Sequence, residues 1–356
     1  MASVPDQLIH SVGSPEAASP AAERDPRLIA VEAARLAATD AVFPVEVKPT
    51  PEERAAREAL FFRISGAAIN SDSARTQRGF VELCERHPEV QKTLEALQRH
   101  HPETYRHSVG VGLIMMALYN EHPELFADFT SEEQDDLARG AFMHDVGKLK
   151  GARMSEDDTV YDPAFYEALG VVGRRPTDAE MSLIKSHTSS EVVADRMNHV
   201  ESGAFDRLGP LTQAVMIGHH SRYNREQAPG AEDPKVQKAM QLMELVDIFE
   251  AVTGVMGPRG YRLHEIQQKP AGFSAAWIDG VLNQTAQSDF QKAVVAVLHT
   301  TVRMDVVISA IHALASRMAQ EAPFLNDAAL YDGYAKALSE AAFRPAVQAS
   351  PALAAA

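Results

Sequence analysis

The chain has 356 residues, 45% of them hydrophobic and 6% aromatic, which is enough for two or three domains or for one large domain with extensions. Its 34 Lys and Arg against 49 Asp and Glu give a net charge of −15, which argues against a broad nucleic-acid-binding surface. The single cysteine, Cys84, excludes an intramolecular disulfide and favours a reducing compartment.

The pattern of apolar residues bears on location. The N-terminus has no basic segment followed by an apolar run, so no signal peptide is expected. The longest apolar run, Val109–Tyr119, is too short to span a bilayer and predicts a buried helix. We therefore expect a cytoplasmic protein that binds neither a membrane nor a nucleic-acid polymer.

The amino-acid composition of the chain changes near residue 50. Residues 1–49 are rich in Pro, Ala, Ser and Glu and are expected to form a flexible arm. Thr50 can cap a helix, Pro51 suits its first position, and Glu53 completes a capping box. A helical N-terminal segment is therefore expected over residues 50–100. Its helices, together with one in the arm, are predicted near 28–38, 51–65, 74–86 and 89–99.

The central part, residues 101–265, is predicted to be a helical domain. One helix, Glu132–Met143, leads directly to His144. Thr177 and Glu180 form a capping box that is expected to open the helix carrying His187. An apolar helix over 211–218 precedes the paired histidines. A long helix is predicted from Asp233-Pro234 to about Val255, with an apolar stripe at helical spacing. That stripe consists of Val236, Met240, Met243 and, unexpectedly, Asp247.

Residues 266–356 are predicted to be a C-terminal helical extension. Met304, Val307, Ile308, Ile311, Leu314 and Met318 form one apolar face there. No internal repeat, glycine-rich phosphate loop or run of alternating β-branched residues is present. The predicted class is all-α.

His144 and Asp145 are adjacent at the end of an apolar helix, and Gly147 and Lys148 follow. An imidazole and a carboxylate in this arrangement can bind one metal ion, and the second carboxylate oxygen can reach a neighbouring ion. Gly147 is expected to allow a tight turn. A His-Asp pair is weak evidence alone, so the other candidate ligands matter.

Eight side chains with imidazole or carboxylate groups are predicted to lie on inner helix faces or at helix ends. Since one ion needs about three or four protein ligands, this set is large enough for two or three ions. Imidazole and carboxylate ligands suit Fe or Mn first, with Zn, Ni, Co or Mg as alternatives. The candidates are Glu103, His107, His144, Asp145, His187, His219, His220 and Asp247.

Each candidate also has an ordinary structural explanation. Glu103 and His107 can be a solvated pair on one helix face, and His187 can be a surface histidine. The pair His219-His220 suits the negative end of a helix. Asp247 can be buried against an arginine.

The ordered set of motifs resembles the HD-GYP branch of the HD-domain metal-dependent phosphohydrolases. The resemblance covers about residues 101–262. The segments that carry it are Tyr105-Arg106-His107-Ser108, His144-Asp145-Val146-Gly147-Lys148, Ile184-Lys185-Ser186-His187, His219-His220 and Asp247-Ile248-Phe249-Glu250-Ala251-Val252-Thr253.

This resemblance implies an all-α HD fold with two or three divalent ions held by the eight candidates. It implies hydrolysis of a phosphodiester by a metal-activated hydroxide, typically of cyclic di-GMP to a linear dinucleotide or GMP. Asp145 would bridge two ions, Glu103 would accompany a third, and Lys148 would approach the bridging solvent and the scissile phosphate. A signalling-protein partner or a homodimer is compatible with such a module.

The segment after His220 lacks the Gly-Tyr-Pro of the family, and Arg259-Gly260-Tyr261-Arg262 resembles its Arg-Pro-Tyr-Arg element, displaced along the chain. Lys148, Arg222, Arg259 and Arg262 are the predicted substrate-binding residues, with Lys150, Arg153 and Lys185 as further candidates for a second phosphate.

Three functions stay open at this point. The first is a phosphodiesterase acting on a cyclic dinucleotide, a small anionic substrate. The second is an HD-family hydrolase of a nucleotide monophosphate, a triphosphate or an alarmone, which the altered loop after His220 motivates. The third is a non-catalytic ligand-sensing module. The intact ligand set argues against the third.

Overall fold

The computed structural model describes residues 64–69, 73–152, 154, 158, 161–169, 176–220, 227–257, 260–320 and 327–342. These residues form α-helices and short 3-10 helices without a sheet, and an isolated antiparallel bridge joins Ile69 to Val302. The predicted all-α class is confirmed. Within the described ranges no helix is both long enough and apolar enough to cross a membrane.

The described elements follow one another along the chain in two halves. The first half contains α3 (Ser73–Arg86), α4 (Pro88–His100), α5 (Pro102–Glu121), η2 (Pro123–Phe126), α6 (Ser131–Met143), η3 (Val146–Gly151), α7 (Pro163–Leu169), α8 (Asp178–Lys185), η4 (Ser186–Thr188) and α9 (Ser190–Val200). The second half contains η5 (Phe205–Arg207), α10 (Pro210–Gly218), α12 (Pro234–Thr253), α13 (Gly260–Gln268), η7 (Pro270–Gly272), α14 (Ala275–Thr285), α15 (Asp289–Thr301), α16 (Met304–Gln320) and α17 (Asp327–Ala342).

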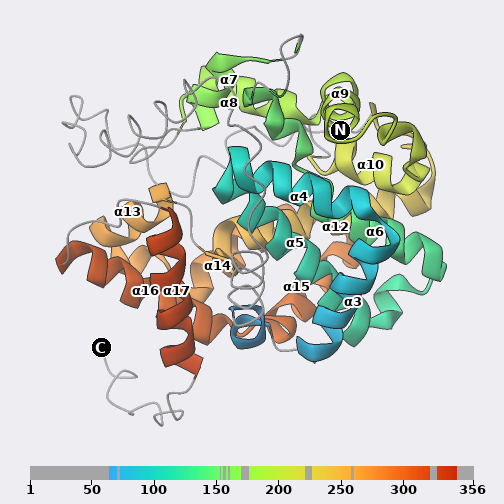
Figure 1. Ribbon diagram of the computed structural model, residues 1–356. Coiled ribbons are helices and arrows are strands. Elements are labelled where there is room, and N and C mark those ends of the chain that lie inside the picture. Colours follow the sequence, from blue (N-terminus) through green and yellow to red (C-terminus); the bar gives the residue numbers. More distant parts are fainter. Residues whose placement is uncertain are drawn as a thin grey trace.

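Helix α5 lies at the centre of the molecule (Figure 1). It packs against α3, α4, α6, α12 and α15. Its residues from Val109 to Leu118 are all buried, as the apolar run predicts for a helix surrounded by other helices. Helix α10 packs against α6 and α12, so residues of α5, α6, α10 and α12 can contribute to one site.

Local sequence signals fix several helix ends as predicted. The capping box of Thr177 and Glu180 opens α8, and Asp233 caps α12 through the backbone N–H of Lys235. Helix α12 ends at Gly254, which has φ 62°, a conformation that favours glycine. The expected helices 74–86 and 89–99 correspond to α3 and α4.

Most of the buried apolar side chains from residue 64 to residue 338 form one connected core. In α16 the predicted face contributes Met304, Val307, Ile311 and Leu314, all buried. Helix α17 packs on α16, and the buried Tyr334 donates a hydrogen bond to the carbonyl oxygen of Val255. The helices on either side of 101–265 therefore pack against the central helices, and the domain boundaries stay a prediction.

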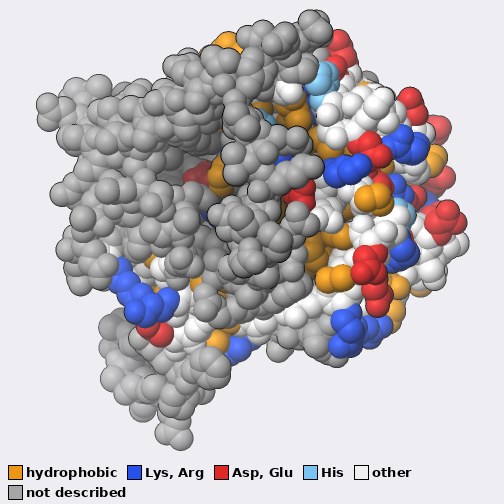
Figure 2. All heavy atoms as spheres, viewed as in Figure 1, with side chains coloured by type: hydrophobic (Ala, Val, Ile, Leu, Met, Phe, Trp, Pro, Cys, Tyr) orange, Lys and Arg blue, Asp and Glu red, His pale blue; other side chains and the backbone are white. Residues whose placement is uncertain are grey.

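Several predictions concern residues outside the described ranges. These are the arm 1–49 with its helix near 28–38, the capping box at Thr50, and most of the helix 51–65. Of that helix only residues 64 and 65 are described, and they belong to a helical stretch over 64–68. On the described part of the face in Figure 2, acidic and basic side chains are interspersed. Surface ion pairs such as Lys235 with Glu133 are consistent with that mixture.

Candidate metal centre

Seven predicted ligands come together in one pocket between α5, α6, α10 and α12, and all of them except His220 are buried. His144 and His219 are completely buried, and Asp145, His187, His107 and Asp247 are between 1% and 5% exposed. They come from a mid-helix position in α5, the C-terminal end of α6, η4, the C-terminal end of α10 and the inner face of α12. Residues that are distant in sequence thus converge, as the resemblance implies.

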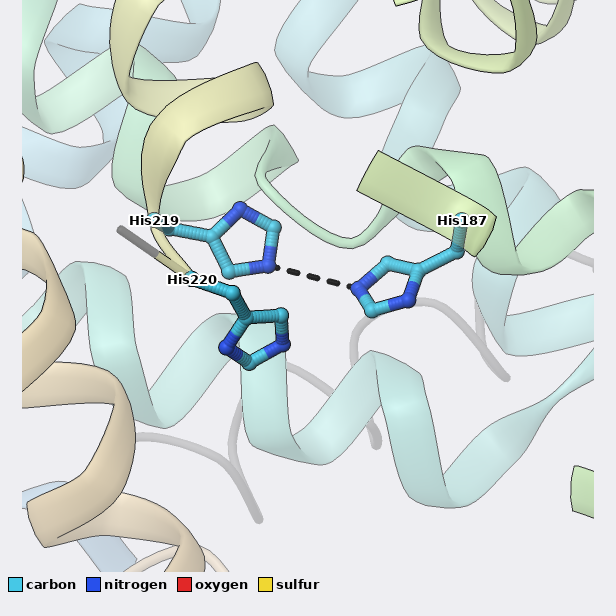
Figure 3. Close-up of side chains that lie close together, drawn as sticks. All are labelled: His187, His219 and His220. Atoms are coloured by element: carbon cyan, nitrogen blue, oxygen red, sulfur yellow. Dashed lines mark hydrogen bonds between the residues drawn. The ribbon is translucent and has the colours of Figure 1, made fainter. Parts of the chain in front are cut away.

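The donor atoms fall into two groups. In each group, one atom from every member lies within 4.8 Å of the others. One group consists of His107, His144 and Asp145, and the other of His187, His219 and His220. In Figure 3 the His219 ring faces the His187 ring, and His220 lies beside both. The pocket therefore offers two adjacent sets of ligands.

Asp145 joins the two groups through its two carboxylate oxygens. Its Oδ2 lies 3.4 Å from His144 Nε2 and 3.7 Å from His107 Nε2. Its Oδ1 lies 3.1 Å from His187 Nε2 and 3.9 Å from His219 Nε2. One carboxylate thus faces both sets of imidazoles, which is the arrangement that a bridging ligand needs.

Asp247 belongs mainly to the first group. Its Oδ1 lies 2.8 Å from His107 Nε2 and 3.8 Å from His144 Nε2. Its Oδ2 lies 3.7 Å from His220 Nδ1. The alternative that Asp247 is buried against an arginine does not fit these contacts, since histidines surround it.

The buried histidines present the same nitrogen to the pocket. His144, His187 and His219 each donate from Nδ1 to the carbonyl oxygen three residues earlier, at 2.8, 2.5 and 2.9 Å. A carbonyl oxygen can only accept, so Nδ1 carries the proton in each ring. In the neutral ring Nε2 then holds a lone pair, and this is the atom that can bind a metal.

Two pairs of these Nε2 atoms face each other at 3.3 Å, namely His144 with His107 and His187 with His219. Two lone pairs repel unless a proton or a cation lies between them. Two nitrogens that each lie about 2.1 Å from one ion stand about 3.0–3.4 Å apart in octahedral or tetrahedral ligation. The donor set and its spacing therefore fit divalent cations.

Protonation states in the pocket favour cation binding. Burial, together with the neighbouring His220, His144 and His187, lowers the pKa of His219 well below its usual value, which keeps the ring neutral. Burial lowers the pKa of His220 to about 3. Burial alone would raise the pKa of Asp145, but Lys148 and the histidines outweigh it, so the pKa of the carboxyl lies well below its usual value.

The pKa of Asp247 is also held well below its usual value, because His107 and the other histidines outweigh the effect of burial. Asp145 and Asp247 thus provide two ionised carboxylates, which a divalent cation can bind without a change in their protonation.

Lys148 follows Asp145 in the 3-10 helix η3, and its Nζ lies 2.5 Å from Asp145 Oδ2. The Lys148 side chain is only 8% exposed. A buried ammonium beside Asp145 is well placed to contact an anion that enters the centre.

The predicted tight turn is present, since the Lys148 N–H donates to the carbonyl oxygen of Asp145 in the 3-10 helix η3. Gly147 lies in this turn without a positive φ. It has a further role, because a Cβ built on it would lie 1.8 Å from the carbonyl oxygen of His187. The absence of a side chain lets η3 approach η4, and this close contact brings His187 to Asp145.

The predicted helix around His187 is wrong in its extent. Helix α8 ends at Lys185, and His187 lies in the short 3-10 helix η4. The reason is that Ser189 caps a new helix, α9, through the backbone N–H of Val192. The turn between the two helices directs His187 into the pocket.

The remaining predictions have mixed outcomes. Glu103 lies in the first turn of α5, one turn before His107, and is half-buried. Lys150 contacts Asp162 and Ser186, so it is held by the protein itself. The predicted substrate-binding residues Arg222 and Arg259, and also Arg153, lie outside the described residues. Only the backbone of Arg262, in α13, is described.

Two buried charged residues near the centre were not among the predicted site residues. Glu250 is buried, and its Oε2 lies 2.5 Å from His107 Nδ1. Glu250 follows Asp247 by three residues, so a second acidic residue on the same face of α12 was the signal. Arg196 is completely buried and contacts Asp158 at 2.7 Å and the carbonyl oxygens of Leu149 and Ala152 at 3.4 Å.

A third cluster of acidic and histidine side chains consists of Asp158, Asp195 and His199. Arg196 contacts both aspartates of this cluster. Its guanidinium therefore pairs with both carboxylates, and through Asp158 it holds the segment after η3 against α9.

In comparisons with known proteins, no family model, no curated protein and no solved structure matches this chain. The HD-GYP resemblance therefore stays an expectation. The chemistry assigned to the centre depends on the residues of this chain and their geometry.

Proposed function

We propose that this chain is a metal-dependent phosphohydrolase of the HD-GYP type, and that it cleaves the phosphodiester of a cyclic dinucleotide such as cyclic di-GMP. The observation that carries the proposal is the position of Asp145 between two groups of imidazoles. A bridging carboxylate between two sets of nitrogen ligands is the arrangement used for two-metal hydrolysis of phosphate esters.

Two ions are proposed, with Fe or Mn as the preferred metals because the ligands are imidazoles and carboxylates without cysteine. His107, His144, Asp145 and Asp247 would hold one ion, and Asp145, His187, His219 and His220 the other. A third ion near Glu103 belongs to the same proposal. When bound, such ions polarise a phosphoryl oxygen and lower the pKa of water toward neutrality.

The residues of the chain supply the rest of the chemistry. Lys148 provides a fixed positive charge that can contact a non-bridging phosphate oxygen, while Asp145 holds its ammonium in place. His220 is 30% exposed, unlike the other histidines of the centre, so an anion reaches the ligands most readily on its side. The proposal of a cyclic dinucleotide as the substrate depends on the family resemblance. Because the segment after His220 differs from that of the family, the experiment tests the substrate separately from the reaction.

The test is to incubate the manganese-loaded full-length protein with cyclic di-GMP and, separately, with bis(p-nitrophenyl) phosphate. A linear dinucleotide or GMP is the expected product, and the variants Asp145→Ala and His144→Ala should form none. Cleavage of the aryl diester alone would support phosphodiester hydrolysis but rule out cyclic di-GMP as the substrate. Release of inorganic phosphate or pyrophosphate from nucleotides would instead favour a nucleotide phosphohydrolase. If none of these compounds is hydrolysed, the proposal that the protein is a phosphohydrolase is wrong.

A further inference from the structure

We propose that Glu250 is a positioning residue of the metal centre, which orients the His107 ring and connects it to the turn that ends α12. This inference rests on the proposed function, since it concerns the same pocket. It adds a residue that is not among the eight candidate ligands.

Three of the histidines are oriented by carbonyl oxygens of their own segments. His144 and His219 lie at the C-terminal ends of α6 and α10, and His187 lies in the turn after α8. Carbonyl oxygens in the last turn of a helix lack helical partners, so the Nδ1 of a histidine placed there can donate to one of them. These three rings need no further support.

His107 is different because it lies inside α5, which begins at Pro102 and continues to Glu121. The carbonyl oxygens around it are used by the helix, so its Nδ1 needs an acceptor from another element. Glu250 of α12 supplies this acceptor, with Oε2 at 2.5 Å. A carboxylate that accepts from the second nitrogen of a ligand fixes the orientation of the ring and increases its basicity.

Glu250 is itself held by the turn that ends α12. Its Oε1 accepts a hydrogen bond from the backbone N–H of Met256 at 3.3 Å. That N–H points back because Gly254, with φ 62°, turns the chain at the end of α12. The carboxylate therefore connects His107 to residues 254–257, which lead directly into the arginine-containing segment 259–262.

Gly110 leaves the space that the Glu250 carboxylate occupies. A Cβ built on Gly110 of α5 would lie 2.7 Å from Glu250 Cγ and 2.8 Å from Oε1. Gly110 is one turn after His107 on the same helix. A larger residue there would displace the carboxylate without removing any polar group, which provides a second way to disturb the contact.

The experiment measures Mn²⁺ binding to the metal-free full-length protein by calorimetric titration. Glu250→Gln keeps the shape of the side chain but replaces one acceptor oxygen with an NH₂ group, so it cannot accept from both His107 and Met256. We expect one of two Mn²⁺ sites to weaken by about 10–100-fold and the other to stay unchanged. Gly110→Ala should weaken the same site.

Two controls separate positioning from a general loss of stability or charge. Glu201→Gln removes a surface carboxylate that contacts Lys92 and Arg207, and it should leave both Mn²⁺ affinities unchanged. His107→Ala should lose one site entirely. Adding Glu250→Gln to that variant should not alter the remaining site, because Glu250 acts through His107.

The outcomes distinguish this inference from the proposed function. If wild-type protein binds no Mn²⁺, both are overturned. If Glu250→Gln binds two ions with wild-type affinities, or changes only the thermal unfolding temperature, the positioning role is wrong and the proposed function stands. Further weakening of the remaining site by Glu250→Gln in the His107→Ala variant would also overturn the role.

Discussion

His107 and Asp247 are 140 positions apart in the sequence, yet His107 Nε2 lies 2.8 Å from Asp247 Oδ1. One side chain comes from the central helix α5 and the other from the inner face of α12. Their contact brings together the first and last of the motifs that suggested a metal centre, and the predictions below test what that centre does.

The position of Asp145 between the two groups predicts unequal effects of ligand removal. Asp145→Ala should lose both bound ions, since its two oxygens face different groups. His187→Ala should keep one ion, because it belongs to one group only. Elemental analysis of manganese-loaded, desalted protein gives the ratio of metal to chain. Equal metal content in the two variants would contradict the bridging role.

Lys148 is expected to affect turnover more than metal binding. Lys148→Met keeps an unbranched side chain as far as Cε but removes the ammonium beside Asp145 Oδ2. We expect kcat for an aryl phosphodiester to fall by about 10²–10³-fold, the usual effect of losing one charge-stabilising donor. The ratio of metal to chain should stay near that of the wild type. Wild-type turnover by this variant would show that Lys148 only neutralises Asp145.

Gly147→Ala should separate η3 from η4. Its Cβ would lie 1.8 Å from the carbonyl oxygen of His187, so the backbone has to move. We expect a loss of about 1–3 kcal/mol or more in the free energy of unfolding, together with weaker metal binding. Gly280→Ala is the matched control, since it lies in α14 and no atom lies within 4 Å of the added Cβ. Urea unfolding of the metal-free proteins compares the two, and similar stabilities would contradict this reason for Gly147.

The buried ion pair of Arg196 and Asp158 is expected to support η3. Arg196→Met leaves the Asp158 carboxylate buried without its guanidinium partner and should lower the free energy of unfolding by about 3–5 kcal/mol. Arg207→Met removes an ion pair at the surface, where the Arg207 side chain is 56% exposed. This variant should change the free energy of unfolding by at most about 1 kcal/mol. Urea titrations at neutral pH measure both, and a small effect at Arg196 would rule out its supporting role.

His100 is expected to make stability depend on pH. Burial, assisted by the charge of Arg99, lowers the pKa of His100 from 6.5 to about 4. The unfolded chain therefore takes up a proton before the folded one does, so this contribution is full above pH 6.5 and is lost as pH falls toward 4. At about pH 5 the loss amounts to about 2 kcal/mol.

The variant His100→Gln isolates that contribution. Its free energy of unfolding should fall less than that of the wild type between neutral and mildly acidic pH. Urea titrations in the presence of a chelator compare the two proteins, and the other histidines contribute equally to both. Parallel curves for the two proteins would show that His100 is not the group responsible.

The helices around the centre could be predicted because their signals are local. The capping box at Thr177 and the cap at Asp233 need only residues within one turn, and the apolar run of α5 follows from its own composition. The end of α8 could not be predicted in the same way. Whether the chain continues through His187 as a helix depends on Ser189 starting α9 and on the contact of Gly147 with the His187 carbonyl oxygen.

The sequence by itself determined the helical class and the identity of the candidate ligands, because helical periodicity, caps and side-chain chemistry are properties of short segments. Only the tertiary structure decided that the two oxygens of Asp145 face different groups of histidines, and that Glu250 supports His107. Those relationships depend on how α5, α6, α10 and α12 pack together. The packing is set by many weak contacts across the whole core, and no single segment contains it.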